Sequence, residues 1–297
     1  MKILVTYKIP FYDEVVKPLV DRGDEVILGR LGELDGTYEG LLCLLTDRIT
    51  AKVIEPALKL KIIANYAVGF DNMDLEACKT RNIMVTNTPC DEVNEAVAEF
   101  TWTLILALSR QLESAADFAK NVGYRGWEPD IFIGADLKGK TLGVIGAGRI
   151  GSIVIEKAAA FGMKVLVHSR SANTKLEDIL AQSDIVSLHV PLTAETHHMI
   201  NSKTVFKHGA YLINTARGPV VDESDLLGLL KDGMLAGAAL DVWENEPYPR
   251  PELVEMPNVI LTPHIASATK SARLAMGKAA VANLVAVDQG QTPPNLV

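Results

Sequence analysis

An arginine, a carboxylate and a histidine, at Arg217, Glu246 and His264, are the residues of this sequence whose types best suit a chemical reaction. An arginine presents a planar cation that holds a carboxylate and polarises an adjacent carbonyl. A histidine titrates near neutrality and can donate a proton to the carbonyl oxygen, and a carboxylate beside it favours its protonated form. We therefore predict that these three residues serve the reduction of a 2-keto acid, with the hydride supplied by a nicotinamide.

A glycine-rich segment provides a second chemical signal, and it reads Gly146-Ala147-Gly148-Arg149-Ile150-Gly151. It follows the apolar run Thr141–Ile145 and opens an alanine-rich helical pattern. In this context the first glycine makes the tight turn, the second lets the backbone approach a pyrophosphate, and the third lets helix and strand pack closely. The helix N-terminus then faces the phosphates. We predict a dinucleotide site here, with an incidental glycine-rich turn as the alternative.

The residues after the next predicted strand bear on which dinucleotide binds. An NAD site is expected to carry a carboxylate about 20 residues after the glycines, where it binds the ribose 2′-hydroxyl. Here the strand ends in His168-Ser169-Arg170-Ser171, and Ser169 lies 18 residues after Gly151. A guanidinium with two hydroxyls suits a 2′-phosphate. The sequence therefore favours NADP(H) over NAD(H), with a solvated surface arginine as the alternative.

Short apolar runs alternate with helical patterns along the chain, which predicts parallel sheets covered by helices on both faces. In the first third we predict strands at Ile3–Thr6, Glu25–Leu28, Gly40–Leu45, Lys61–Asn65 and Ile83–Thr86. From residue 140 onward we predict strands at Thr141–Ile145, Lys164–His168, Ile185–His189, Ala210–Asn214, Gly237–Leu240 and Val259–Leu261. Helices are predicted at Tyr12–Asp21, Ala51–Ala57, Asp74–Thr80, Asn94–Arg110, Lys175–Leu180 and Ser271–Asp288.

These strands bring the chemically active residues to one place. Arg217, Asp241 and His264 each follow a predicted strand, and Glu246 lies just beyond Asp241. Parallel sheets bind their ligands at the carboxyl ends of the strands. Any one of these residues alone could be a surface residue, but their joint placement at one edge of a sheet favours a site.

The domain organisation follows from the same pattern, which predicts an α/β protein with two doubly wound parallel-sheet domains. The final helix comes after the last strand of the second series, and we expect it to pack back on the first domain. The prediction is a flavodoxin-like substrate domain over residues 1–91 and 272–297, interrupted by a Rossmann cofactor domain over residues 92–271.

Composition excludes several classes of partner. The net charge is −8 and no run of Lys or Arg compensates for it, which argues against nucleic-acid binding. No apolar stretch approaches the roughly 18 residues of a membrane span, and the apolar run at the N-terminus is too short for a secretory signal. The three cysteines lack metal-ligand spacing, so we predict no metal site and a reduced, cytoplasmic location.

The chain resembles the D-isomer-specific 2-hydroxyacid dehydrogenases over essentially its whole length, and within them it is most like glyoxylate and hydroxypyruvate reductases. The matching segments are 65–72, 87–89, 146–151, 190–193, 214–222, 240–247 and 262–267. The resemblance implies that Arg217 binds substrate and that His264 is the acid/base. It also implies that Glu246, which precedes a proline, pairs with His264, although Glu244 is a nearby rival.

The resemblance implies further contacts as well. The backbone amides of Val68 and Gly69 would bind the substrate carboxylate, and Leu45 would line the pocket. The remaining cofactor contacts would be Pro191, Thr215, Ala216, Asp241 and Ala266, with Asp241 on the nicotinamide side. Similar reductases are homodimers in which a loop tryptophan reaches the neighbouring active site. Trp127 matches that position, with a core or dimer-contact role as the alternative.

One segment departs from the family pattern. Only 15 residues separate Ser169 from the strand at Ile185. Family members usually have some ten more there, including a short strand, so we expect the sheet edge beside the ribose to be abridged. Two alternative functions stay open: a short 3-phosphoglycerate dehydrogenase or another member of the family with a different substrate, and a cofactor-sensing interaction protein.

Overall fold

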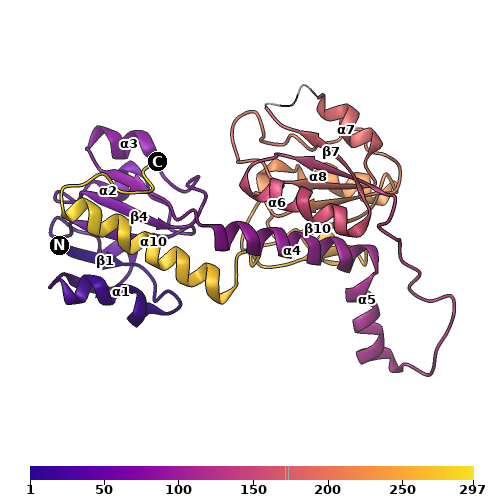
Figure 1. The fold of residues 1–297 in the computed structure, drawn as a ribbon, viewed down its shortest axis with the longest axis horizontal. Helices are drawn as coiled ribbons and strands as arrows, with labels where there is room; N and C mark the ends of the chain where they lie inside the picture. The colour runs from indigo at the N-terminus through magenta and orange to yellow at the C-terminus, as the bar shows by residue number, and fades with distance from the viewer. Residues whose placement is uncertain (171, 173) are drawn as a thin grey trace. The chain divides into compact units, whose positions relative to one another are not determined.

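The computed structural model describes residues 1–170, 172 and 174–297, with the backbone alone at 122 and 123. Ser171, one of the predicted cofactor residues, lies outside the described residues. The chain forms two compact units. Unit 1 contains residues Met1–Val93 and Ala268–Val297, and unit 2 contains residues Asn94–Ser267. Each unit is a parallel sheet with helices on both faces (Figure 1), so the predicted α/β class is confirmed.

Unit 1 is built on five parallel strands in the order β2-β1-β3-β4-β5. Their bounds are β1 Lys2–Val5, β2 Glu25–Leu28, β3 Gly40–Leu44, β4 Ile62–Tyr66 and β5 Met84–Thr86. The helices are α1 Tyr12–Asp21, α2 Ala51–Ile54, α3 Leu75–Thr80 and α10 Lys270–Asp288, with a short 3-10 turn, η1, at Leu31–Glu33. Side chains alternate between the two faces of a strand. Strands β1, β3 and β4 are apolar and buried along nearly their whole length, so both faces of the sheet are apolar. Leu4, Leu41 and Ile63 pack with residues of α2 and α3 on one face, whereas α10 packs on β4 and α1.

Unit 2 is built on six parallel strands in the order β11-β10-β9-β8-β6-β7. Their bounds are β6 Thr141–Ile145, β7 Lys164–His168, β8 Ile185–Leu188, β9 Ala210–Asn214, β10 Leu235–Leu240 and β11 Val259–Leu261. The helices are α4 Asp91–Ser109, α5 Leu112–Asp117, α6 Arg149–Ala158, α7 Leu176–Gln182, α8 Glu223–Lys231 and α9 Pro251–Val254. Side chains of α4 and α6 share one apolar cluster with the sheet, and those of α7 and α8 share another, so the core has two layers.

Most predicted elements lie within one or two residues of the observed ones. The largest differences are at α2, which ends at Ile54 ahead of Pro56, and at α4, which begins at Asp91 and not at Asn94. The sequence did not predict α5 or the π-helical segment η2 that follows it at Phe118–Gly123. No residue of α5 is buried, so this helix lacks the apolar stripe that makes a helix visible in a sequence. Among the described residues, no helix is both long and apolar enough to cross a membrane.

Candidate active site

The glycine turn of unit 2 lies where the strand order reverses, between β6 and β8. Gly146 has φ of 100°, and a Cβ there would lie 2.7 Å from the carbonyl carbon of His189, while a Cβ at Gly151 would overlap the carbonyl oxygen of Gly146. At Gly148 a Cβ would meet nothing within 4 Å. Gly148 also precedes α6 without any side-chain cap, so the first N–H groups of this helix are open to a ligand. These features fit a dinucleotide pyrophosphate, for which such a crevice is the usual site.

His189 follows β8 beside this turn. Its Nε2 lies 2.8 Å from the Ser187 hydroxyl, and its backbone N–H donates to the Ile145 carbonyl. Burial lowers the pKa of His189 to about 4, so the imidazole is neutral near pH 7. A neutral, fixed imidazole supports the turn and is a poor proton donor.

The end of β7 is the predicted ribose site. Arg170 is exposed, and the Ser169 hydroxyl accepts a hydrogen bond from the Ala172 N–H at 3.2 Å. Thr174 lies against the end of β7, because its hydroxyl donates to the Val167 carbonyl at 2.7 Å. Within the described residues no strand lies between β7 and α7, so β7 ends the sheet. Neither Ser169 nor Arg170 carries a carboxylate, so neither side chain would repel a 2′-phosphate.

Arg217 is carried by a stiff turn after β9. Asn214 is 1% exposed; its Oδ1 accepts the Ala216 N–H at 3.0 Å and its Nδ2 donates to the Arg217 carbonyl at 2.9 Å. The Arg217 guanidinium donates to the Ala216 carbonyl at 2.7 Å. The Thr215 hydroxyl lies 3.1 Å from that of Thr101 on α4. Both Thr215 and Ala216 are buried, and their hydrogen bonds stabilise this turn. Their contact with a cofactor stays a prediction.

The turn after β9 touches the loop after β10. A Cβ at Gly218 would overlap the backbone carbonyl of Trp243 and press on the Glu244 nitrogen. Only glycine allows this approach without a shift of one loop. The arginine loop and the carboxylate loop are therefore in contact through their backbones.

Asp241 organises the loop that carries His264. It is 1% exposed and accepts three hydrogen bonds, from the Thr262 hydroxyl at 2.7 Å, the Ile265 N–H at 2.9 Å and the Ala266 N–H at 2.8 Å. Burial raises the pKa of Asp241, and the hydrogen bonds oppose that rise. Sequence reasoning gave Asp241 only a place beside the nicotinamide. Its contacts with this loop have no sequence signature, because they join residues more than 20 positions apart.

His264 and Glu246, the predicted acid/base pair, are in contact. His264 Nδ1 lies 2.9 Å from Glu246 Oε2, and the two side chains are 26% and 31% exposed. His264 has φ of 54°, and its N–H points to the carbonyls of Asp241 and Thr262, each 2.9 Å away. Contact of Nδ1 with a carboxylate leaves Nε2 for proton transfer. The rival Glu244 faces elsewhere, with Oε1 2.6 Å from Nε2 of His198.

In unit 1 the loop after β4 presents Val68 and Gly69. Asn87 Nδ2 donates to the Val68 carbonyl at 2.7 Å, and Asn65 Nδ2 donates to the Gly69 carbonyl at 2.9 Å. Within the described residues, no hydrogen bond occupies the N–H groups of Val68 and Gly69. Two peptides whose carbonyls are held and whose N–H groups are open can bind an anion. Sequence reasoning missed both asparagines, although Asn65 opens the segment 65–72 and Asn87 opens Asn87-Thr88-Pro89.

Two predicted contact residues have exposed side chains. Leu45, after β3, is 37% exposed and Trp127 is 82% exposed. Among the residues that the structure describes, neither belongs to the apolar clusters that cover the two sheets. Pro191 is exposed after β8, and its carbonyl accepts a hydrogen bond from the Thr196 hydroxyl at 2.6 Å. Their predicted roles toward substrate and cofactor stay predictions.

Comparison with known proteins supplies the family. A profile described as "D-isomer specific 2-hydroxyacid dehydrogenase, NAD binding domain" matches residues 102–266, which is more than half of the chain. Glyoxylate reductase of Thermococcus litoralis is 44% identical over 289 residues, which cover 92% of this chain and 86% of that protein. A crystal structure of a protein from Thermus thermophilus has a TM-score of 0.94 at 42% identity, with 100% of both chains covered.

A further solved structure is that of the NADPH-dependent glyoxylate/hydroxypyruvate reductase of Sinorhizobium meliloti. It has a TM-score of 0.87 at 30% identity and covers 100% of this chain and 97% of that one. The matched range, residues 102–266, includes Arg217, Glu246 and His264. The chain therefore belongs to the D-isomer-specific 2-hydroxyacid dehydrogenase family, whose members are pyridine-nucleotide-dependent oxidoreductases.

Proposed function

We propose that the protein reduces glyoxylate, or a similarly small 2-keto acid such as hydroxypyruvate, to the D-2-hydroxy acid. The observation that carries the proposal is the contact of His264 Nδ1 with Glu246 Oε2 at 2.9 Å, at the edge of a sheet that also carries Arg217. This pair can deliver a proton from Nε2 and stabilise the imidazolium before delivery. The names of the relatives agree with a substrate of this size.

Each proposed role follows from the chemistry of the side chain. Arg217 binds the substrate through its guanidinium fork and draws electron density from the keto oxygen. His264 donates the Nε2 proton to that oxygen, and Glu246 holds the ring in one tautomer. The open amides of Val68 and Gly69 are proposed to bind the substrate carboxylate. When bound at the glycine turn, the nicotinamide nucleotide supplies the hydride.

The substrate is tested by assaying glyoxylate, hydroxypyruvate, pyruvate and 3-phosphohydroxypyruvate against oxidation of the reduced cofactor. We expect the highest kcat/KM with glyoxylate or hydroxypyruvate. A clear preference for 3-phosphohydroxypyruvate would move the assignment to a short 3-phosphoglycerate dehydrogenase. Absence of turnover with every keto acid, in a protein that still binds cofactor, would favour a cofactor-sensing interaction protein.

For the cofactor we propose NADP(H) over NAD(H). The support is the exposed Arg170 beside Ser169 and the lack of a carboxylate at both positions. Arg170→Ala should raise KM for NADPH by about 10-fold and leave KM for NADH nearly unchanged, because one charged hydrogen bond contributes about 1.5 kcal/mol or more. Ser169→Asp should shift the preference towards NADH. A wild-type protein that prefers NADH by a wide margin would refute this assignment.

We also propose that the protein is a homodimer in a cytoplasmic location. The support for a dimer lies in unit 2, where α5 and the segment after it expose Leu112, Tyr124, Trp127 and Ile133, which are 59%, 57%, 82% and 71% exposed. A hollow of about 370 Å³ lies beside α5, lined in part by Leu108, Tyr211 and Ile260. Exposed apolar side chains next to a hollow of mixed polar and apolar lining are typical of an interface. Light scattering on wild type and Trp127→Ser tests the dimer, and a monomeric wild type would refute it.

A further inference from the structure

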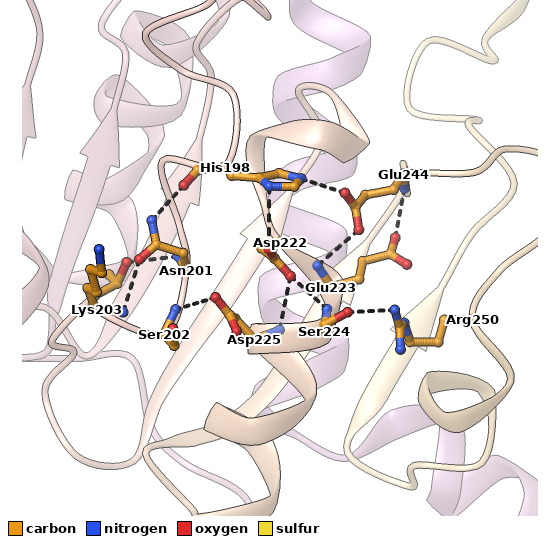
Figure 2. Close-up of polar contacts among 11 residues, drawn as sticks. His198, Asn201, Ser202, Lys203, Asp222, Glu223, Ser224, Asp225, Glu244 and Arg250 are labelled. Atoms are coloured by element: carbon orange, nitrogen blue, oxygen red, sulfur yellow. Dashed lines mark hydrogen bonds and ion pairs between the residues drawn. The ribbon is translucent and has the colours of Figure 1, made fainter.

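A set of hydrogen bonds ties the turn that carries Glu246 to the first residues of α8 (Figure 2). The backbone N–H of Glu244 donates to Oε1 of Glu223 at 2.7 Å, and the N–H of Glu223 donates to Oε2 of Glu244 at 3.2 Å. Each carboxylate thus accepts the amide hydrogen of the other residue. These two hydrogen bonds hold Glu244, which lies two residues before Glu246, beside Glu223 at the start of α8.

His198 makes the third contact of Glu244. Its Nε2 lies 2.6 Å from Glu244 Oε1, and its Nδ1 lies 3.4 Å from Asp222 Oδ2. The imidazole therefore lies between carboxylates from two chain segments, as Figure 2 shows. The backbone N–H of His198 donates to the Pro219 carbonyl at 2.8 Å, in the loop that carries Arg217. One residue outside the proposed catalytic set is thus bonded to both catalytic loops.

The turn is tied on its other side as well. Arg250 Nη2 donates to the Ser224 hydroxyl at 2.7 Å, next to Glu223 at the start of α8. Glu246 lies in the chain between these two ties, and its side chain is 31% exposed. Within the described part of the chain, its side chain hydrogen-bonds only to His264. The position of Glu246 accordingly depends on the ties at either end of its turn.

The carboxylates in this cluster need partners of opposite charge. Glu223 is 3% exposed, and burial raises its pKa; the hydrogen bond from the Glu244 N–H opposes that rise and the Glu244 carboxylate adds to it. The positive end of the α8 dipole counters this repulsion, and the His198 imidazole lies in contact with the Glu244 carboxylate. Removing His198 would leave Glu244 facing Asp222 and Glu223 without that partner, and like charges would then push the turn away from α8.

We propose that His198, Glu223 and Glu244 are positioning residues that hold the turn carrying Glu246, so that Glu246 keeps its contact with His264. The effect on turnover rests on the proposed function, whereas the mechanical tie does not. A displacement of about 1 Å near the reacting groups can cost on the order of 100-fold in rate. Loosening the turn should therefore lower kcat and leave the affinity for substrate and cofactor unchanged.

The first test compares His198→Asn with His208→Asn. Asparagine is too short to reach Glu244, but it tolerates the left-handed backbone of His198, whose φ is 51°. His208 is an exposed histidine of the same unit and serves as the matched control. We expect kcat to fall by about 10-fold in His198→Asn, with both KM values within about 2-fold of wild type. His198→Gln, which keeps a longer donor, should recover part of the loss, and a wild-type kcat in His198→Asn would overturn the proposal.

A double-mutant cycle separates positioning from a general structural role. In a Glu246→Ala background there is no carboxylate left to position, so adding His198→Asn should lower kcat by less than about 2-fold more. A structural role would give the same 10-fold loss in both backgrounds, which would contradict the proposal.

Amide hydrogen exchange tests the tie without any assay of activity. We expect the segment 241–248 to exchange about 10-fold faster in His198→Asn than in wild type, and at the wild-type rate in His208→Asn. If the wild type reduces no 2-keto acid, the proposed function is wrong. The hydrogen-exchange measurement still tests whether His198 holds the turn. Unchanged exchange in His198→Asn overturns the tie, whatever the activity.

Discussion

The carboxyl edges of the two sheets carry different chemistry although their strands are arranged alike. Strands β7, β6, β8, β9 and β10 of unit 2 repeat the order of β2, β1, β3, β4 and β5 in unit 1. In unit 1 the side chains that hold the loop after β4 are the amides of Asn65, Asn72 and Asn87. In unit 2 the corresponding edge carries Arg217, Asp241, Glu246 and His264. Amides fix a backbone without titrating, whereas ionisable groups can bind charge and move a proton.

Replacing His264 should give the largest effect and should mark the edge of unit 2 as the chemical one. His264→Asn suits a backbone φ of 54° but has no acid/base group. We expect kcat to fall by roughly 10²–10⁴, the usual contribution of a positioned acid/base. Cofactor binding, measured by titration of NADPH fluorescence, should stay within about 2-fold. Loss of cofactor binding would instead mean that His264 supports the fold of the site.

Gly218→Ala tests whether the two loops of unit 2 need their close backbone contact. The added methyl group would overlap the Trp243 carbonyl, so we expect a loss of about 1–3 kcal/mol in the free energy of unfolding. Gly228 provides the control, because it lies in α8 with nothing within 4 Å of a Cβ. Gly228→Ala should raise stability by about 0.5–1 kcal/mol. Equal denaturant midpoints for the two variants would show that the loops can separate freely.

His189 of unit 2 should make the stability of the protein depend on pH. In the unfolded chain His189 takes up a proton near pH 6.5, but in the folded protein it does so only near pH 4. The unfolded state therefore binds more protons between these values, and the free energy of unfolding falls as pH drops from 6.5 to 4. Between pH 6.5 and pH 4 the free energy of unfolding should fall by about 3 kcal/mol less in His189→Gln than in wild type, because each unit of pKa shift is worth about 1.4 kcal/mol. Parallel urea-denaturation profiles for variant and wild type would contradict this.

Asn87→Ala should give the smallest effect and should mark the edge of unit 1 as a binding edge. It removes the hydrogen bond to the Val68 carbonyl, which is worth about 1 kcal/mol. We expect KM for the keto acid to rise by about 5-fold with kcat nearly unchanged. Thr88→Val is the neighbouring control, since within the described residues the buried Thr88 hydroxyl has no hydrogen-bond partner. A fall in kcat at constant KM would place Asn87 in the chemical step.

The strands and the chemically active residues could be predicted, because both leave local signals in the sequence. Apolar runs such as Ala210–Asn214 gave the strand bounds, and the glycine spacing marked the dinucleotide turn. Contacts between distant segments leave no such signal. The ties of Asp241 to Ile265 and of Glu244 to Glu223 join residues 24 and 21 positions apart. The contacts of His198 are of the same kind, since its partners Glu244 and Asp222 lie on segments that only the folded sheet brings together.

The path of the chain through the two units has a consequence for biosynthesis. Unit 2 is one continuous segment, whereas unit 1 needs α10, whose buried Ala280 and Leu284 belong to the last part of the chain. Leu296 also pairs with Thr86 in an antiparallel bridge. A ribosome therefore delivers all of unit 2 before the sheet of unit 1 can be covered. We expect the nascent chain to hold a finished second half beside a first half that still exposes an apolar face, and this is the stage at which a chaperone is most needed.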